Sequence, residues 1–157
     1  TVTFAAAKTR LDAEDAVKQR MVRQVLLSSA SATCFAVVFG GSIYEVIITL
    51  IGTLFGMSAY YLLDGIKLPR FISYFAGAAL IAIAARIGQS FRAELLISVV
   101  ITSGIMPMLP GLIMTNAMRD SINGDIVSTA ARVVEALMTA VSIAAAVGIV
   151  LMAGNIL

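Results

Sequence analysis

Long stretches without a single charged residue constrain this chain more than any other feature. They cover Gln24–Tyr44, Val46–Leu63, Phe71–Ala85, Leu95–Met118 and Ala136–Leu157. A helix needs about 20 mostly apolar residues to cross the hydrocarbon core of a bilayer. Because lipid offers no hydrogen bonds to the backbone, only helices and closed barrels can span it. The intervals therefore predict an all-α integral membrane protein with about five transmembrane helices.

Composition supports the membrane class, and two charged residues help to locate the ends of the third and fifth spans. Hydrophobic residues make up 60% of the 157 residues and charged residues 13%, whereas a soluble domain of this length needs more polar surface. We expect the third span to continue past Arg86, whose long side chain can reach the interface. The fifth span should begin earlier than its charge-free part, near Asp125. Gly52 and Gly56 in the second span form a small-x-x-x-small pattern, which we interpret as helix packing.

The sequence lacks the residues that several classes of function require. The chain has no histidine and a single cysteine, Cys34, which excludes histidine-based zinc and nucleophile sites and any multi-cysteine metal site. No glycine-rich phosphate-binding motif occurs. The net charge of +2 is too small to indicate a nucleic-acid partner. We therefore expect no enzyme activity, no cofactor, no metal and no nucleic acid.

The distribution of lysine and arginine predicts the orientation. Alternating loops place eight of them on the side of the N-terminus and two on the other side, with Arg132 counted as intramembrane. Basic residues favour the cytoplasmic side, so the N-terminus should face the cytoplasm and the C-terminus the outside. Residues 1–24 are interpreted as a cytoplasmic lead-in, the end of a missing N-terminal domain. Residues 25–157 form the predicted transmembrane domain.

The fourth span carries two helix-breaking residues within four positions. Pro107 and Pro110, the latter followed by Gly111, should unwind or sharply kink the helix between Pro107 and Gly111. A half-helix that restarts there would point its free N–H groups and positive dipole end at the break, as transporters do toward anionic substrates. A plain packing kink is the alternative, and the prolines alone do not decide between the two.

Polar residues follow the break on two predicted helices. The fourth span continues with Thr115, Asn116, Arg119 and Asp120. On the last helix, Asp125, Ser128, Arg132, Glu135, Thr139 and Ser142 recur at spacings of three and four, so they form one stripe. If that helix enters the bilayer at Asp125, a rise of 1.5 Å per residue places Glu135 about 15 Å deep, near the middle.

Two interpretations of these charges remain open. Charges at that depth cost several kcal/mol and usually face a cavity, each other or a substrate path. Burial also favours the protonated form of a carboxyl group, so Glu135 is the candidate for proton coupling. Alternatively, Arg132 and Glu135 pair only to lock helices together. Arg119 could likewise form an ordinary pair with Asp120 or Asp125.

The stretch MPMLPGLIMTNAMRDSINGDIVSTAARVVEAL, from Met106 to Leu137, resembles the signature of the threonine/serine exporter family. The resembling features are the proline–glycine break, T-N-A-x-R-D, G-D, an arginine and E-A. In that family a cytoplasmic domain precedes five membrane helices. A second five-helix half follows, or a partner subunit supplies it. This sequence matches the first membrane half and lacks the second.

The resemblance implies a secondary exporter subunit in the cytoplasmic (inner) membrane of a prokaryote. Its substrate would be a small polar metabolite, threonine or serine, and its export would be coupled to protons. A succinate (dicarboxylate) exporter subunit and a non-transporting assembly subunit are the alternatives. Its partners would be the lipid bilayer and other protein chains. These chains would be a second five-helix membrane subunit, further copies of this chain, or both. The substrate-binding positions carried over are Pro110, Gly111, Thr115, Asn116, Arg119, Asp120, Asp125 and Arg132, with Glu135 for proton coupling.

Overall fold

Within the residues that the structure describes, the chain forms six α-helices and one short 3-10 helix. The computed structural model describes residues 2–66 and 68–156, and the side-chain environments of residues 18–66 and 68–154. The elements are α1 (Val2–Val38), α2 (Ile43–Gly65), α3 (Arg70–Phe91), α4 (Ile97–Ile105), η1 (Met106–Met108), α5 (Gly111–Ile122) and α6 (Ile126–Ile156). No strand occurs in the described ranges, so the predicted all-α class is confirmed.

Four of the helices are long and apolar enough to cross a membrane by themselves. These are residues 18–38 of α1, then α2, α3 and most of α6. The segment from Ile97 to Met108 and α5 pass the same test as a pair bent by 50°, which makes up to five spans. The predicted break is thus confirmed. Helix α3 continues past Arg86 to Phe91, and α6 begins at Ile126, both as expected.

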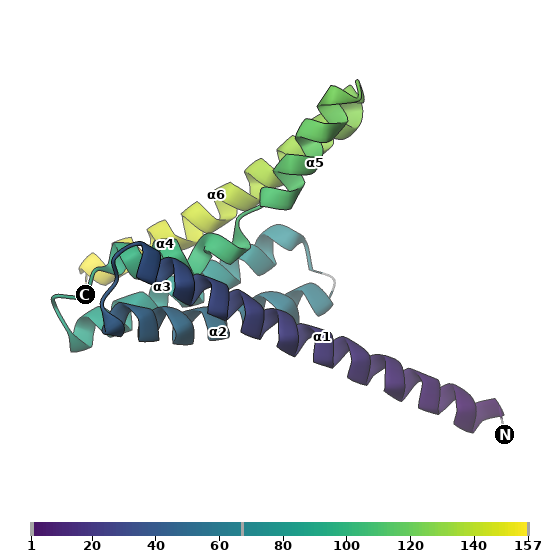
Figure 1. Cartoon of the computed structure of the whole chain (residues 1–157), viewed down its shortest axis with the longest axis horizontal. Coiled ribbons are helices and arrows are strands. Elements are labelled where there is room, and N and C mark those ends of the chain that lie inside the picture. Colours follow the sequence, from purple (N-terminus) through teal and green to yellow (C-terminus); the bar gives the residue numbers. More distant parts are fainter. Residues whose placement is uncertain (1, 67, 157) are drawn as a thin grey trace.

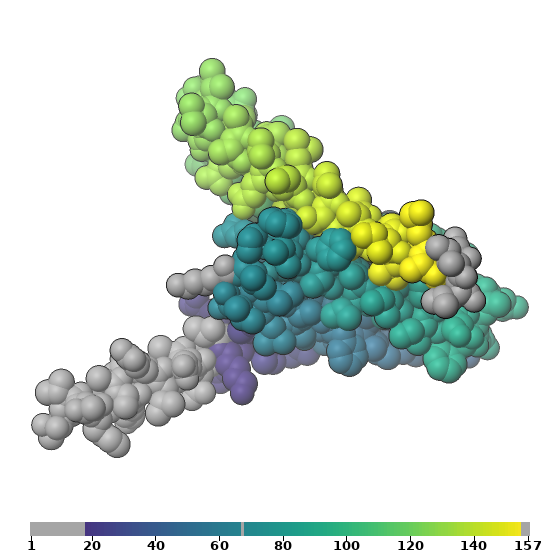
Figure 2. All heavy atoms as spheres, turned by 180° about the vertical axis from the view of Figure 1, so that it is seen from behind, coloured from purple at the N-terminus to yellow at the C-terminus, as the bar shows by residue number. Residues whose placement is uncertain are grey.

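Helices α1 to α4 form a bundle, and α6 packs along α3 (Figure 1). Helix α5 packs on α6 and has no comparable contact with α1, α2 or α3 in the described part of the chain. We call α5 and residues 126–135 of α6 the arm. Figure 2 shows the arm in green, standing clear of the bundle.

The contacts between α3 and α6 fix the direction of α6. Arg70 donates a hydrogen bond to Glu135 and Arg86 donates one to the carbonyl of Leu151, and each pair is separated by 65 residues. The two helices are therefore parallel. Because α3 ends at one end of the bundle and α6 starts from the other, the chain between them must return across. The broken pair α4–α5 accordingly runs back along the bundle toward the end at which α3 begins.

The end of the first span differs from the prediction. The charge-free interval extends to Tyr44, but α1 ends at Val38, and Glu45 lies inside α2. A turn intervenes because Gly40 adopts a φ of +76°, which favours glycine. The Glu45 carboxylate accepts hydrogen bonds from the backbone N–H and the hydroxyl of Ser42. Glu45 is thus a capping residue, and the charge that bounded the interval does not mark a loop.

Small residues let α2 and α3 approach closely. A Cβ atom added at Gly56 would lie 2.7 Å from the carbonyl oxygen of Gly77, and one added at Gly77 would lie 2.9 Å from that of Gly56. Gly52, one turn away, faces Ala84 in the same way. The interpretation of Gly52 and Gly56 as packing residues is confirmed.

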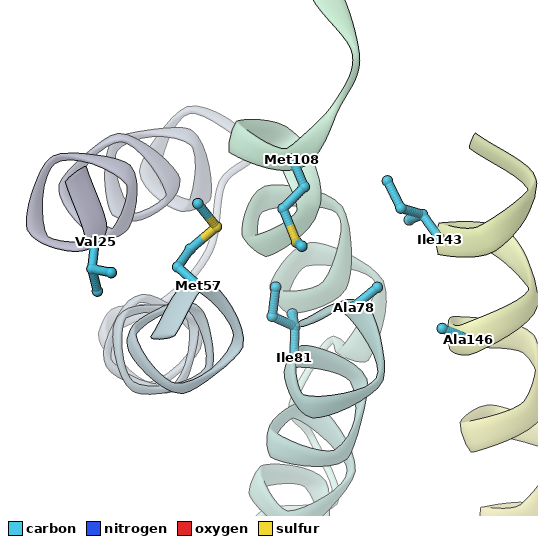
Figure 3. Packing of buried hydrophobic residues seen from close by; sticks show 7 residues of the cluster. All are labelled: Val25, Met57, Ala78, Ile81, Met108, Ile143 and Ala146. Atoms are coloured by element: carbon cyan, nitrogen blue, oxygen red, sulfur yellow. The ribbon is translucent and has the colours of Figure 1, made fainter. Parts of the chain in front are cut away.

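The packed core anchors the bundle side of the break. Met57, Ile81 and Met108 are buried together with Ile143 and Ala146 of α6 (Figure 3). The 3-10 helix therefore inserts its last side chain, Met108, between α3 and its neighbours.

The Gly56–Gly77 contact predicts the effect of one added methyl group. Gly56→Ala should separate α2 from α3 and destabilise the protein by about 1–3 kcal/mol, the usual cost of overpacking. Thermal denaturation of the purified protein in detergent measures this as a lower midpoint. Gly148→Ala is the matched control, because Gly148 is also helical and has nothing within 4 Å of an added Cβ. Equal midpoints for Gly56→Ala and the unaltered protein would contradict the predicted contact.

Candidate functional site

The break between η1 and α5 is a non-helical linker of two residues, Leu109 and Pro110. Leu109 has β-region dihedrals, and Pro110 immediately precedes the first residue of α5, Gly111. The N–H of Gly111 donates to the carbonyl of Leu109 at 2.8 Å. Gly111 is exposed, and an added Cβ would meet nothing within 4 Å. The start of α5 is thus unwound and open, as the two prolines predicted.

Three of the predicted site residues on α5 have open side chains. Thr115, Asn116 and Arg119 are exposed. The hydroxyl of Thr115 donates back to the carbonyl of Gly111 at 2.8 Å, so it reinforces the first turn. Arg119 forms neither a salt bridge nor a hydrogen bond with the described residues. This face of α5 therefore presents polar groups, one of them cationic, to whatever lies outside the chain.

The side of α5 that packs on α6 is fixed through Asp120. One oxygen of its carboxylate, Oδ2, accepts from Nε of Arg132 at 2.6 Å and from the hydroxyl of Ser128 at 2.9 Å. Its side chain is 23% exposed and that of Arg132 41%. Charge-assisted hydrogen bonds of this kind are roughly twice as strong as neutral ones. Asp120 and Arg132 therefore determine how α5 lies on α6.

Asp125 closes the turn between the two helices. Its Oδ1 accepts from the backbone N–H of Ser128 at 3.0 Å, which caps the start of α6. Gly124 supplies the positive φ of +79° that the turn requires. Asp125 itself is exposed, and its second oxygen forms no hydrogen bond with the described part of the chain.

The charged residues do not pair as sequence proximity suggested. Arg132 and Glu135, three apart, bind different partners, and Arg119 is paired with neither Asp120 nor Asp125. The structure thus divides the predicted set. Asp120, Arg132 and Asp125 hold the hairpin together, whereas Thr115, Asn116 and Arg119 are open.

Glu135 connects the arm to the bundle. Its Oε1 accepts from Nη1 of Arg70 at 2.8 Å, with side-chain exposures of 41% for Glu135 and 67% for Arg70. Arg70 is the first residue of α3, so Glu135 lies level with an end of α3 and not half-way along it. The expected depth was counted from Asp125, but the first ten residues of α6, about 15 Å of helix, belong to the arm. The next polar residue of the stripe, Thr139, is buried.

Two charged residues with structural partners were not predicted as site residues. Arg70 had been counted only for orientation, and its partner is 65 residues away, so no local pattern could reveal the pair. Glu45 also accepts from the N–H of Leu96 at 3.0 Å, which joins the start of α2 to that of α4. The spacing of Ser42 and Glu45 is that of a capping box, a signal that the sequence does contain.

Comparison with known proteins gives one match. The family model described as "Putative threonine/serine exporter" matches residues 1–154. No curated protein and no solved structure matches the chain. The family match covers the bundle, the break and the arm, and it agrees with an all-helical chain that has several membrane-spanning helices. The chain therefore belongs to the threonine/serine exporter family, a family of membrane transporters.

Proposed function

We propose that this chain is a subunit of a secondary active exporter that moves threonine- or serine-like amino acids out of the cytoplasm in exchange for protons. The observation that carries the proposal is the open polar face of α5. There Arg119 is unpaired and lies on the same helix as an exposed N-terminal turn. The neighbouring acid, Asp120, is neutralised by Arg132. An exposed guanidinium without a partner in the described chain is available to a carboxylate of a ligand.

The substrate carboxylate would bind Arg119 by charge-assisted hydrogen bonds. Thr115 and Asn116 supply further polar groups, and Pro110 and Gly111 leave the backbone at the start of α5 accessible. Asp120 and Arg132 act indirectly, by holding α5 on α6.

The ammonium group of an amino acid needs an acid. Asp125 retains a carboxylate oxygen without a partner among the described residues and is therefore the better candidate than Asp120. A dicarboxylate such as succinate would need no acid there. An amino acid is thus the favoured substrate, and succinate is the alternative that an efflux assay separates.

The arm needs a second wall to form a closed path. Large apolar side chains on it are openly exposed, together with the polar ones. They include Leu112 at 81%, Ile122 at 85%, Ile126 at 79% and Val127 at 82%. A path that excludes lipid and bulk water needs protein on both sides of the polar face. We therefore propose that a second five-helix membrane subunit, further copies of this chain, or both cover the arm.

Proton coupling is assigned to Glu135. When charged, it holds Arg70 and so ties the start of α6 to α3. Protonation removes that attraction and frees the arm from its polar contact with the bundle. An exposed pair contributes only about 0–1 kcal/mol, so it can bias an equilibrium between two arm positions without locking either.

The proposed location is the cytoplasmic membrane of a prokaryote, with the N-terminus in the cytoplasm and the C-terminus outside. The parallel direction of α3 and α6 supports an odd number of crossings, which puts the two ends on opposite faces. The excess of basic residues on the side of the N-terminus supports the direction.

A non-transporting assembly subunit is the second candidate. The observation in its favour is that Asp120, Arg132, Arg70 and Glu135 all join one helix to another. Under that proposal, Arg119 would contact a partner subunit and not a solute.

Efflux from proteoliposomes tests the exporter proposal. Vesicles containing the protein and its second membrane half are loaded with threonine, serine or succinate. Arg119→Gln should lower the initial rate about tenfold or more, because a hydrogen bond to a charged group contributes about 1.5–3 kcal/mol. Arg20→Gln, which removes an exposed arginine from α1, is the matched control and should export normally. Succinate efflux without amino-acid efflux would establish the alternative substrate.

Two other outcomes would count against the proposal. If an intact assembly moves none of the three solutes, the chain is not this kind of exporter. If Arg119→Gln exports at the normal rate, the substrate binds elsewhere. Size-exclusion chromatography of each variant with its partner subunit distinguishes lost assembly from lost transport.

A pH gradient tests the role of Glu135. Glu135→Gln removes the titratable group, so an imposed gradient should no longer change the efflux rate, although downhill efflux continues. Arg70→Gln keeps the carboxyl group and should retain a response. Glu94→Gln, in the turn between α3 and α4 at the other end of the bundle, is the control and should respond normally. A normal gradient response from Glu135→Gln would rule out this residue as the coupling group.

A further inference from the structure

A narrow apolar groove runs along the outside of the bundle between α2 and α3. Its volume is about 360 Å³. The side chains that line it are Ile48, Ile51 and Phe55 of α2, with Ala84, Ile87 and Gly88 of α3. The groove exists because Ala84 and Gly88 have little or no side chain, while Ile51 and Ile87 stand beside them, 46% and 55% exposed. Contact between Ile48 and Gly88 closes its floor.

The groove has the length of one bilayer leaflet. On α2 it extends from Tyr44 to Phe55. Eleven residues at 1.5 Å each give about 16 Å, which is about half of the 30 Å hydrocarbon core. The acyl chain of one leaflet therefore has the length of this groove.

One end of the groove carries a fixed cation. Arg92 directly follows Phe91, the last residue of the span formed by α3. Its guanidinium carbon lies 3.9 Å from the centroid of the Tyr44 ring. Arg92 forms no ion pair with any described residue, Glu94 included. Tyrosine and arginine at the end of a span are typical of the lipid headgroup region.

We propose that this groove binds one acyl chain of an anionic phospholipid, with the lipid phosphate on Arg92. Stacking on Tyr44 occupies one face of the guanidinium and leaves N–H groups at its edge to donate to phosphate oxygens. The apolar walls accept the acyl chain, and the length of the groove matches the thickness of the leaflet that carries the headgroup. This site lies on α2 and α3, away from the open face of α5, and does not depend on the proposed transport function.

Lipid titration of the purified protein tests the proposal. Phosphatidylglycerol and phosphatidylcholine with identical chains are added to the full chain in detergent. Native mass spectrometry counts the lipids retained, and the thermal midpoint gives the apparent affinity. We expect one phosphatidylglycerol retained with about fivefold higher affinity than phosphatidylcholine, because both lipids carry the phosphate but only phosphatidylcholine adds a choline cation that Arg92 repels. Arg92→Gln should abolish this preference. Arg20→Gln, an exposed arginine outside the groove, should preserve it.

A second variant tests the groove separately from the charge. Ile87→Trp adds volume at an exposed position of the wall and should weaken binding of both lipids, without lowering the midpoint measured in their absence. Glycerol phosphate, a headgroup without chains, should give no stabilisation at the same concentration.

Three results would overturn the proposal. Equal affinity for the two lipids in the unaltered protein would show that Arg92 does not select an anionic headgroup. A preference that survives Arg92→Gln would place the anion elsewhere. A dimer in detergent that Ile87→Trp dissociates would show that a second copy of the chain covers the groove.

Discussion

The structure depends on one constraint: inside a bilayer, every backbone amide must find its hydrogen-bond partner within the protein. The described chain meets it with long helices, and inside a span it leaves the regular α-helix only between Met106 and Gly111. Met108 anchors the first side of this break in the core. The second side, α5, is bent by 50° from the segment formed by α4 and η1, and it packs on α6. The location of the open polar face follows from that asymmetry.

The charges near the break divide into those that position helices and those that remain open. Asp120 and Arg132 neutralise each other across the hairpin, and Glu135 with Arg70 joins the hairpin to the bundle. Both pairs are partly exposed, so each contributes little net stability and mainly fixes geometry. Arg119 is left as an unpaired cation on the helix that carries the family motif. This separation makes Arg119 the natural candidate for substrate contact.

Two surfaces of the molecule, the arm and the groove between α2 and α3, expose apolar side chains together with different polar groups. The arm combines exposed apolar side chains with open polar ones, as expected of a surface that a second protein wall completes. The groove between α2 and α3 is almost wholly apolar and carries a single cation at its end, as expected of a lipid site. Because α3 and α6 pack in parallel, the broken segment between them runs back along the bundle, from the end that carries Arg92 toward the arm.

The sequence alone determined the features that depend on local order along the chain. Apolar length predicted the spans, the two prolines predicted the break, and the motif around Arg119 predicted the family that the family model confirms. Only the tertiary structure decided which charges pair. Arg132 binds Asp120, 12 residues away, and Glu135 binds Arg70, 65 residues away, because a side chain's partner depends on how helices rotate and pack. Spacing along one helix says nothing about that rotation.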